Sequence, residues 1–235
     1  MDVTHGITRH GVRHGALVLA ASLPYMPVGV HMAVVDPQVG TERRAVAVRC
    51  GDGRLLVGPD NGVLSLAWER AGGIDQAVDI SRSPHRLEPV SATFHGRDLF
   101  APVAAHLAAG AELADAGDPL AADELVTLEL PAPVLRDGES VAHALVIDGF
   151  GNVALDLQHQ HLLGMGLVIG APVVVRAGHL ERRAVFVQTF ADVGTGELLI
   201  YEDAWAYVAV AINRGDAATE LSIAPDDELR IAPAP

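Results

Sequence analysis

Opposite charges follow a predicted strand in the segment over residues 34–44. A buried strand over 30–35 ends at Asp36, and a turn then leads to Arg43 and a second arginine. In open α/β sheets, ligands bind beside the carboxyl ends of the strands, so a carboxylate and a guanidinium at this edge could bind and polarise a small molecule. The alternative is a surface turn whose solvated ion pair contributes little.

A second cluster, residues 94–98, precedes a predicted helix and reads Phe-His-Gly-Arg-Asp. In one interpretation Asp98 caps that helix and His95 is an ordinary loop residue. In the other, His95 lies at the mouth of the sheet beside Asp36 and Arg43, where an imidazole could exchange a proton with a bound molecule. The local sequence leaves both interpretations open.

The third cluster, residues 148–152, combines a carboxylate, two glycines, an aromatic ring and an amide. A strand that ends at Asp148 would present the carboxylate, Phe150 could stack on a ring, and Asn152 offers both a donor and an acceptor. The glycines allow the backbone to come close to a ligand. A glycine-assisted hairpin, in which Asn152 is favoured by turn geometry, explains the same residues equally well.

Histidines near the N-terminus offer a fourth candidate site. His10 and His14 are spaced four apart on a predicted helix, which is a spacing that can hold a metal. No glutamate completes the H-E-x-x-H arrangement, and Gly11 weakens the helix. We therefore predict solvated histidines and no metal site.

The elements that must position these side chains alternate between helix and strand in the first half of the chain. Thr8 is expected to cap a helix over 9–22, and Asp98 to open another over 99–109 that ends at Gly110. Apolar runs between them predict three strands. Such alternation predicts an α/β domain with a mostly parallel sheet. The three strands are expected over residues 30–35, 44–49 and 55–58.

The second half of the chain is predicted to consist mainly of strands. Residues 111–140 are rich in Ala, Asp, Glu and Pro, and we place a linker over 121–137 between an α/β domain over 1–120 and a second domain over 138–235. Short apolar runs with turn residues between them favour a small antiparallel β-barrel for that second domain. Strands are expected over residues 141–147, 153–157, 172–176, 183–190, 197–201, 207–212 and 228–231.

The composition limits the possible partners and compartments. Half of the 235 residues are apolar, which suffices for a substantial core, and the formal net charge is -14 with no lysine. An acidic chain without a basic stripe is not expected to bind nucleic acid. No stretch reaches the roughly 18 apolar residues that span a bilayer, so no membrane segment is expected. Cys50 is the only cysteine and no signal peptide is evident, so we expect a cytoplasmic protein without disulfides.

Taken in order, the clusters resemble the S-adenosylmethionine hydroxide adenosyltransferases, a family related to the fluorinases and chlorinases. The resemblance covers nearly the whole chain, and its most specific part is the block over 94–105. A later segment, residues 207–218, is similar to the family's C-terminal adenine-side segment. The motifs that carry the resemblance are residues 36–44, Gly58-Pro59-Asp60-Asn61-Gly62, residues 94–105, residues 148–152 and Asn213-Arg214-Gly215.

The resemblance implies an N-terminal α/β domain, a C-terminal β-barrel and a homotrimer that holds its substrate between neighbouring subunits. It implies that S-adenosylmethionine is the substrate and that no cofactor is needed. It also implies a catalytic triad of Asp36, Arg43 and His95. Because the halogenating relatives lack this triad, its presence favours water over halide as the nucleophile. The substrate-binding residues implied in the same way are Asp148, Phe150, Asn152 and Arg214.

The implied reaction is attack of water at the 5′ carbon, which gives adenosine and L-methionine. The sulfonium already provides a good leaving group, so the protein must position a nucleophile in line with it. The guanidinium of Arg43 would favour hydroxide-like character in a nearby water by opposing its negative charge. His95 would take or relay the proton, and Asp36 would orient one of these side chains and balance charge.

The sequence departs from the family pattern at three places. The family's opening strand ends in an Asp-Phe-Gly-type turn whose Asp contacts the ribose, and it has no counterpart before Met1, so we expect either a start assigned too late or a shortened form. Gln38 replaces a glycine, and Ala204 and Trp205 replace small or serine residues near the methionine end. The missing ribose contact keeps open a second function, a module that binds adenosine or S-adenosylmethionine without turnover. A halogenase is the third.

Overall fold

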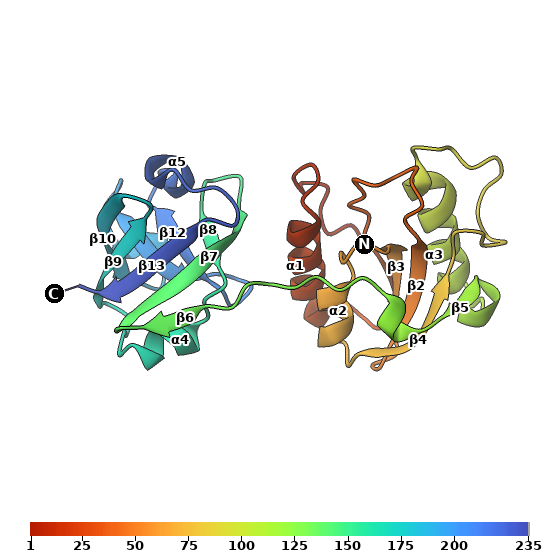
Figure 1. Cartoon of the computed structure of the whole chain (residues 1–235), viewed down its shortest axis with the longest axis horizontal. Coiled ribbons are helices and arrows are strands. Elements are labelled where there is room, and N and C mark those ends of the chain that lie inside the picture. Colours follow the sequence, from red (N-terminus) through yellow and green to blue (C-terminus); the bar gives the residue numbers. More distant parts are fainter. Residues whose placement is uncertain (235) are drawn as a thin grey trace. The chain divides into compact units, whose positions relative to one another are not determined.

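The chain separates into two compact units, Met1–Leu128 and Glu129–Pro235. The computed structural model describes residues 1–234 of the sequence. Each unit has its own sheet (Figure 1). Each unit also has its own clusters of buried apolar side chains.

A five-stranded sheet forms the centre of the first unit. In spatial order its strands are β1 (Val30–Met32), β3 (Leu55–Pro59), β2 (Ala45–Cys50), β4 (Ile74–Asp79) and β5 (Asp118–Leu120). Within this sheet only β1 and β3 run parallel, and the other neighbouring pairs are antiparallel. The sheet is therefore mixed, and the expectation of a mostly parallel sheet is wrong. The reason is local, since residues 51–54 alone join β2 to β3 and cannot make the long crossover that a parallel pair needs.

Helices cover both faces of this sheet. On one face α1 (Val12–Ser22) and α2 (Ser65–Arg70) share a core with Val46 of β2. On the other face α3 (Ala101–Ala108) shares a core with Ala47. Alternate residues of β2 thus enter two different cores, which explains why this strand is apolar along almost its whole length. The short helical turns of this unit are η1 (Leu23–Tyr25), η2 (Gly96–Phe100, a π-helical turn), η3 (Leu113–Asp115) and η4 (Ala122–Glu124).

Both helix caps expected from the sequence are wrong. Helix α1 begins after Gly11 without a side-chain cap, and the carbonyl of Thr8 instead accepts a bond from the Gly11 amide at 3.0 Å. Asp98 lies inside η2, where its buried carboxylate accepts from the Ser91 amide at 2.8 Å and from Arg97. The Asp98 carboxylate therefore connects the preceding loop, at Ser91, to the helical turn, and it does not cap the helix.

Seven strands of the second unit close into a barrel. They are β7 (Glu139–Ile147), β8 (Val153–Leu155), β9 (Pro172–Ala177), β10 (Leu180–Phe186), β11 (Leu198–Glu202), β12 (Val208–Ile212) and β13 (Glu228–Pro233). The order is β13-β9-β10-β11-β12-β8-β7, and a pairing of β13 with β7 closes the ring, while β6 (Val134–Arg136) attaches to β7. The C-terminal β-barrel is confirmed, with one parallel pair, β10 and β11, among otherwise antiparallel neighbours in residues 129–234.

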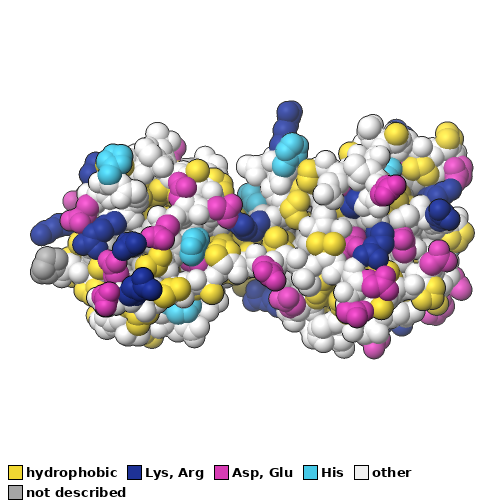
Figure 2. All heavy atoms as spheres, viewed as in Figure 1, with side chains coloured by type: hydrophobic (Ala, Val, Ile, Leu, Met, Phe, Trp, Pro, Cys, Tyr) yellow, Lys and Arg dark blue, Asp and Glu magenta, His cyan; other side chains and the backbone are white. Residues whose placement is uncertain are grey.

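Apolar side chains, among them Phe186, fill the interior of the barrel. Short helices connect its strands, and ion pairs lie on its surface. The helices are α4 (His159–Gly164), η5 (Phe190–Asp192) and α5 (Ala217–Leu221). Side chains of both charges lie next to one another on its surface (Figure 2), where Glu139 pairs with Arg176 at 2.9 Å and with Arg230 at 3.1 Å. Among residues 1–234, no helix has the length and apolar character needed to cross a membrane.

Candidate active site

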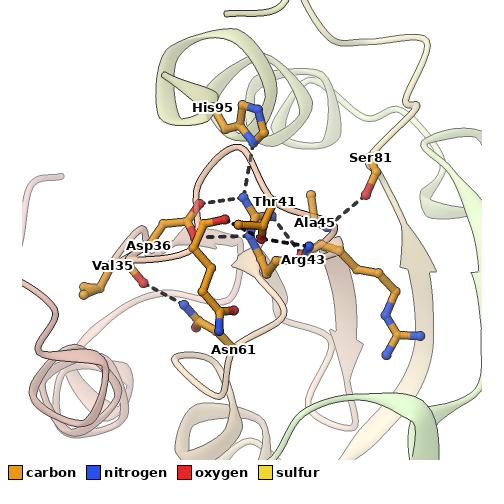
Figure 3. Close-up of polar contacts among 10 residues, drawn as sticks. Val35, Asp36, Thr41, Arg43, Ala45, Asn61, Ser81 and His95 are labelled. Carbon is orange, nitrogen blue, oxygen red and sulfur yellow. Dashed lines mark hydrogen bonds and ion pairs between the residues drawn. The ribbon is translucent and has the colours of Figure 1, made fainter. Parts of the chain in front are cut away.

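A buried ion pair lies at the end of β1 in the first unit. Asp36 follows this strand and Arg43 precedes β2, so one loop carries both groups (Figure 3). The guanidinium binds the carboxylate with two parallel bonds, Nε to Oδ1 at 3.1 Å and Nη2 to Oδ2 at 2.6 Å. Their side chains are only 3% and 6% exposed, for Arg43 and Asp36 respectively. A two-point bond of this kind fixes the orientation of both groups.

The loop between them is shaped by its own hydrogen bonds and by one glycine. The amides of Val39 and Thr41 donate to the carbonyls of Asp36 and Gln38, at 3.3 and 3.1 Å. Gly40 has a φ of +82°, and a Cβ there would lie 2.8 Å from the carbonyl oxygen of Ala92. Gln38 is not among the residues of positive φ, so the backbone of this turn does not need a glycine at that position.

His95 reaches the ion pair from a segment 52 residues away in the sequence. It stands directly before η2, and its Nδ1 lies 3.2 Å from Nη2 of Arg43. Because a guanidinium can only donate hydrogen bonds, Nδ1 is the acceptor, and the neutral ring then carries its proton on Nε2. The close approach of Gly40 to Ala92 brings the segment that precedes His95 against the loop of the ion pair. The structure thus brings Asp36, Arg43 and His95 into one hydrogen-bonded cluster.

The guanidinium of Arg43 has little capacity left for further partners. Two of its five N–H groups bind Asp36, one binds His95 and one, on Nη1, donates to the carbonyl of Arg44 at 2.8 Å. The ring of Phe100 lies 5.4 Å from the guanidinium carbon. One N–H on Nη1 therefore remains for a water or ligand atom.

Two cavities border this cluster, and their linings share no residue. The first, about 430 Å³, is lined by parts of residues 4–10 and 34–39, including Asp36. The second, about 440 Å³, is lined by Arg43 and His95 together with the charged side chains of Glu42, Arg86 and Glu88. Asp36 therefore lines the first cavity, and Arg43 lines the second.

Neighbouring residues that were not among the predicted site residues hold the cluster in place. Asn61 donates from Nδ2 to the carbonyl of Val35 at 2.8 Å, which fixes the chain directly before Asp36. Asp60 is 7% exposed and pairs with Arg44, the residue after Arg43, at 2.9 Å. Both residues lie in the Gly58-Pro59-Asp60-Asn61-Gly62 motif that carries the family resemblance, which did not assign either of them a role.

Three of the predicted substrate-binding residues, Asp148, Phe150 and Asn152, lie in one loop of the second unit. Hydrogen bonds within the loop fix its shape. The Asp148 carboxylate accepts from the amides of Phe150 and Asn152, at 2.8 and 3.0 Å, and from Nδ2 of Asn152 at 2.8 Å. Phe150 is left 80% exposed at the tip. Gly151 has a φ of +83°, and a Cβ there would meet Asp216 at the start of α5. The loop is therefore a rigid turn that presents an aromatic ring to solvent.

Arg214, the remaining candidate, lies in the turn after β12 with a φ of 60°. It is exposed, and within residues 1–234 no hydrogen bond or ion pair links it to the loop over 148–152. The N-terminal histidines form no metal cluster either, since no three His, Cys, Asp or Glu side chains of the described chain are grouped closely enough to hold an ion.

Comparison with known proteins places both units in one family. The description of the N-terminal domain of SAM hydroxide adenosyltransferases matches residues 1–117, and that of the C-terminal domain matches residues 142–230. The (R)-S-adenosyl-L-methionine hydrolase of Salinispora tropica is 48% identical over 98% of this chain and 85% of its own length. The fluorinase of Actinoplanes sp. is 31% identical over 91% of this chain and 80% of its own.

A solved structure shares the fold over almost the whole chain. An uncharacterized conserved protein from Thermotoga maritima is 36% identical and superposes with a TM-score of 0.89, covering 99% of this chain and 88% of that one. The matches extend over both units and include the segments that carry the buried cluster and the barrel loop. The chain belongs to the SAM hydroxide adenosyltransferase family.

Proposed function

We propose that this protein hydrolyses S-adenosyl-L-methionine by attack of water at the 5′ carbon, which gives adenosine and L-methionine. The observation that carries the proposal is the buried, hydrogen-bonded cluster of Asp36, Arg43 and His95. Similarity to relatives also supports the proposal, because the chain is 48% identical to the Salinispora protein named a hydrolase and only 31% identical to the Actinoplanes fluorinase.

The cavity beside Asp36 is the better place for the reacting part of the substrate. Its lining includes Ile7, Val34, Val35, Pro37 and Val39, and small-molecule sites are mostly apolar with a few placed polar groups. The cavity beside Arg43 is lined by four charged side chains and suits water better than a ribose or a thioether. We therefore assign the 5′ carbon and the sulfonium to the cavity of Asp36.

The cluster then prepares a water for attack. Each oxygen of the Asp36 carboxylate accepts one bond from Arg43 and keeps a second acceptor position for a water in the cavity. Arg43 holds that carboxylate in one orientation, and its positive charge favours hydroxide-like character in the water as the proton leaves it. His95 accepts from Nη2 and so fixes the guanidinium. When the new C5′–O bond forms, the C5′–S bond breaks, its electron pair stays on the sulfur, and one proton is released.

The barrel residues are proposed to bind the rest of the substrate. The exposed ring of Phe150 offers a stacking surface for adenine, and Arg214 and the polar edge of Asn152 offer donors. The carboxylate of Asp148 suits a cationic ammonium group, although it also closes its own loop. We also propose a homotrimer, which light scattering coupled to size exclusion would test.

Product analysis tests the proposed reaction and separates it from the alternatives. The protein is incubated with S-adenosylmethionine in ¹⁸O-labelled water, with and without chloride or fluoride, and the products are identified by mass spectrometry. Hydrolysis predicts methionine and adenosine whose 5′ oxygen carries the label. Binding without product would support the non-catalytic module, and 5′-halo-adenosine would support a halogenase. Either result refutes the proposal.

Substitution tests the role of the cluster. Arg43→Ala and His95→Ala are expected to lower the rate of adenosine release by about 100-fold, the size of effect seen when one electrostatic or positioning group is lost. Arg182→Ala, at an exposed position of the barrel, is the control and is expected to leave the rate unchanged. Unchanged adenosine release in the first two variants would show that the cluster is not catalytic.

A further inference from the structure

One imidazole in the cavity of Asp36 has no assigned role. His10 lines this cavity together with Asp36, in the segment over 4–10 that forms part of its wall. Its ring makes no hydrogen bond or ion pair with any other residue of the described chain, 1–234. His5 also lines the cavity, but its Nε2 pairs with Asp2 at 3.0 Å. His10 is therefore the imidazole of this cavity that is free to bind a water.

The backbone holds His10 in an uncommon conformation. Its φ is 65°, in the left-handed region, which is uncommon for residues other than glycine, although asparagine, aspartate and histidine adopt it more often than the rest. A turn imposes this angle, because the Gly11 amide donates to the carbonyl of Thr8 at 3.0 Å and the Val12 amide donates to the carbonyl of His10 at 2.8 Å. Helix α1 begins directly afterwards and anchors the turn. The position of the ring at the cavity is thus set by the start of a packed helix.

The reaction releases a proton, and the cluster itself is badly placed to take it. The Nδ1 atom of His95 already accepts a bond from Arg43, and its Nε2 carries the ring proton. His95 also lines the other cavity. An imidazole is the side chain best suited to accept a proton near neutral pH. His10 meets both requirements, since it shares the cavity of Asp36 and its ring is unoccupied.

We propose that His10 is a further catalytic residue, the base that takes the proton from the attacking water. In this step the oxygen of a water held by Asp36 bonds to the 5′ carbon, the C5′–S bond breaks with its electron pair on the sulfur, and a ring nitrogen of His10 receives the proton. His10 is solvent-exposed, so the proton passes to bulk water after the products leave. This inference rests on the proposed hydrolysis and on the assignment of the 5′ carbon to this cavity.

The test uses two substitutions that the left-handed backbone tolerates. His10→Asn and His10→Gly keep the turn, because asparagine and glycine adopt positive φ readily, yet neither side chain can act as a base. Both are expected to lower kcat by about 100-fold, within the usual range for loss of a general base, with KM changed less than about threefold. Added imidazole is expected to restore at least about a tenth of the lost kcat in His10→Gly and to have no effect on the wild type. His179→Gln, at an exposed position of the barrel outside both cavities, is the matched control and is expected to keep wild-type kcat.

The outcomes separate this inference from the proposed function. Wild-type protein that releases no adenosine would refute the hydrolysis itself. Wild-type activity together with His10 variants whose kcat stays within about twofold would refute the role of His10 alone. A rise in KM without a loss of kcat, or a loss of kcat that imidazole does not restore, would also refute it, because a purely structural role predicts no rescue. Circular dichroism of each variant verifies that the fold is retained.

Discussion

Replacing Asp36 by asparagine should destabilise the first unit even though the side chain keeps its size. The carboxylate accepts two charge-assisted bonds from Arg43, and both side chains are almost fully buried. The amide can accept at one oxygen only, and its NH₂ group would then face an N–H of the guanidinium. The variant therefore loses at least one such bond, worth about 1.5–3 kcal/mol, and leaves a buried charge without its partner. Breaking a buried pair from one side costs about 3–5 kcal/mol, so we expect the free energy of unfolding to fall by about 3 kcal/mol.

Urea denaturation followed by circular dichroism measures this change. The control is Glu181→Gln, which removes the charge from an exposed pair with Arg176, and it should leave the unfolding midpoint unchanged. A second variant, Asp36→Asn with Arg43→Gln, removes the unpaired charge and should recover part of the lost stability. If Asp36→Asn unfolds at the wild-type urea concentration, or if the double variant loses the sum of both single changes, the ion pair is not the buried, charge-coupled unit described above.

Three further predictions concern other parts of the chain. Gly151→Ala should lower the melting temperature of the barrel, because its φ of +83° strains an alanine and the new Cβ would collide with Asp216, the cap of α5; an unchanged melting curve would contradict this. Burial, aided by Arg54, lowers the pKa of His31 below its ordinary 6.5. The unfolded chain then takes up a proton that the folded chain does not, so the free energy of unfolding should fall as the pH drops below about 6.5, and denaturation of His31→Gln at several pH values should show a weaker fall. Burial raises the pKa of Cys50 to about 11, so iodoacetamide should label it in urea but not in buffer, as mass spectrometry can measure.

Local residue patterns predicted many of the strands. The apolar runs over 44–49 and 55–58 correspond to β2 and β3 within one residue at each end. Strand β4 was not predicted, because Asp75 and Gln76 interrupt its apolar pattern, although its later residues are buried in the sheet. Helix α2 was also missed, since its six residues are too few to display a helical period.

The direction of the strands could not be read from the same patterns. A buried strand is apolar whether its neighbour runs parallel or antiparallel, so alternation of helix and strand suggested a parallel sheet. The connections decided otherwise, because a short turn joins β2 to β3 and antiparallel pairing follows from it. The barrel was easier to predict, since seven short strands with turns between them have few other ways to bury their apolar faces.

The sequence by itself determined which side chains were available, and it brought Asp36 and Arg43 together because they lie seven residues apart on one loop. Only the tertiary structure decided that His95, 52 residues beyond Arg43, completes the cluster and that the cluster separates two cavities. Local propensities act over a few residues, whereas the meeting of distant segments depends on how helices pack on a sheet. The left-handed turn that places His10 in the cavity of Asp36 depends on both levels, since histidine adopts a positive φ more often than most residues and the start of α1 directly after it fixes where the turn lies.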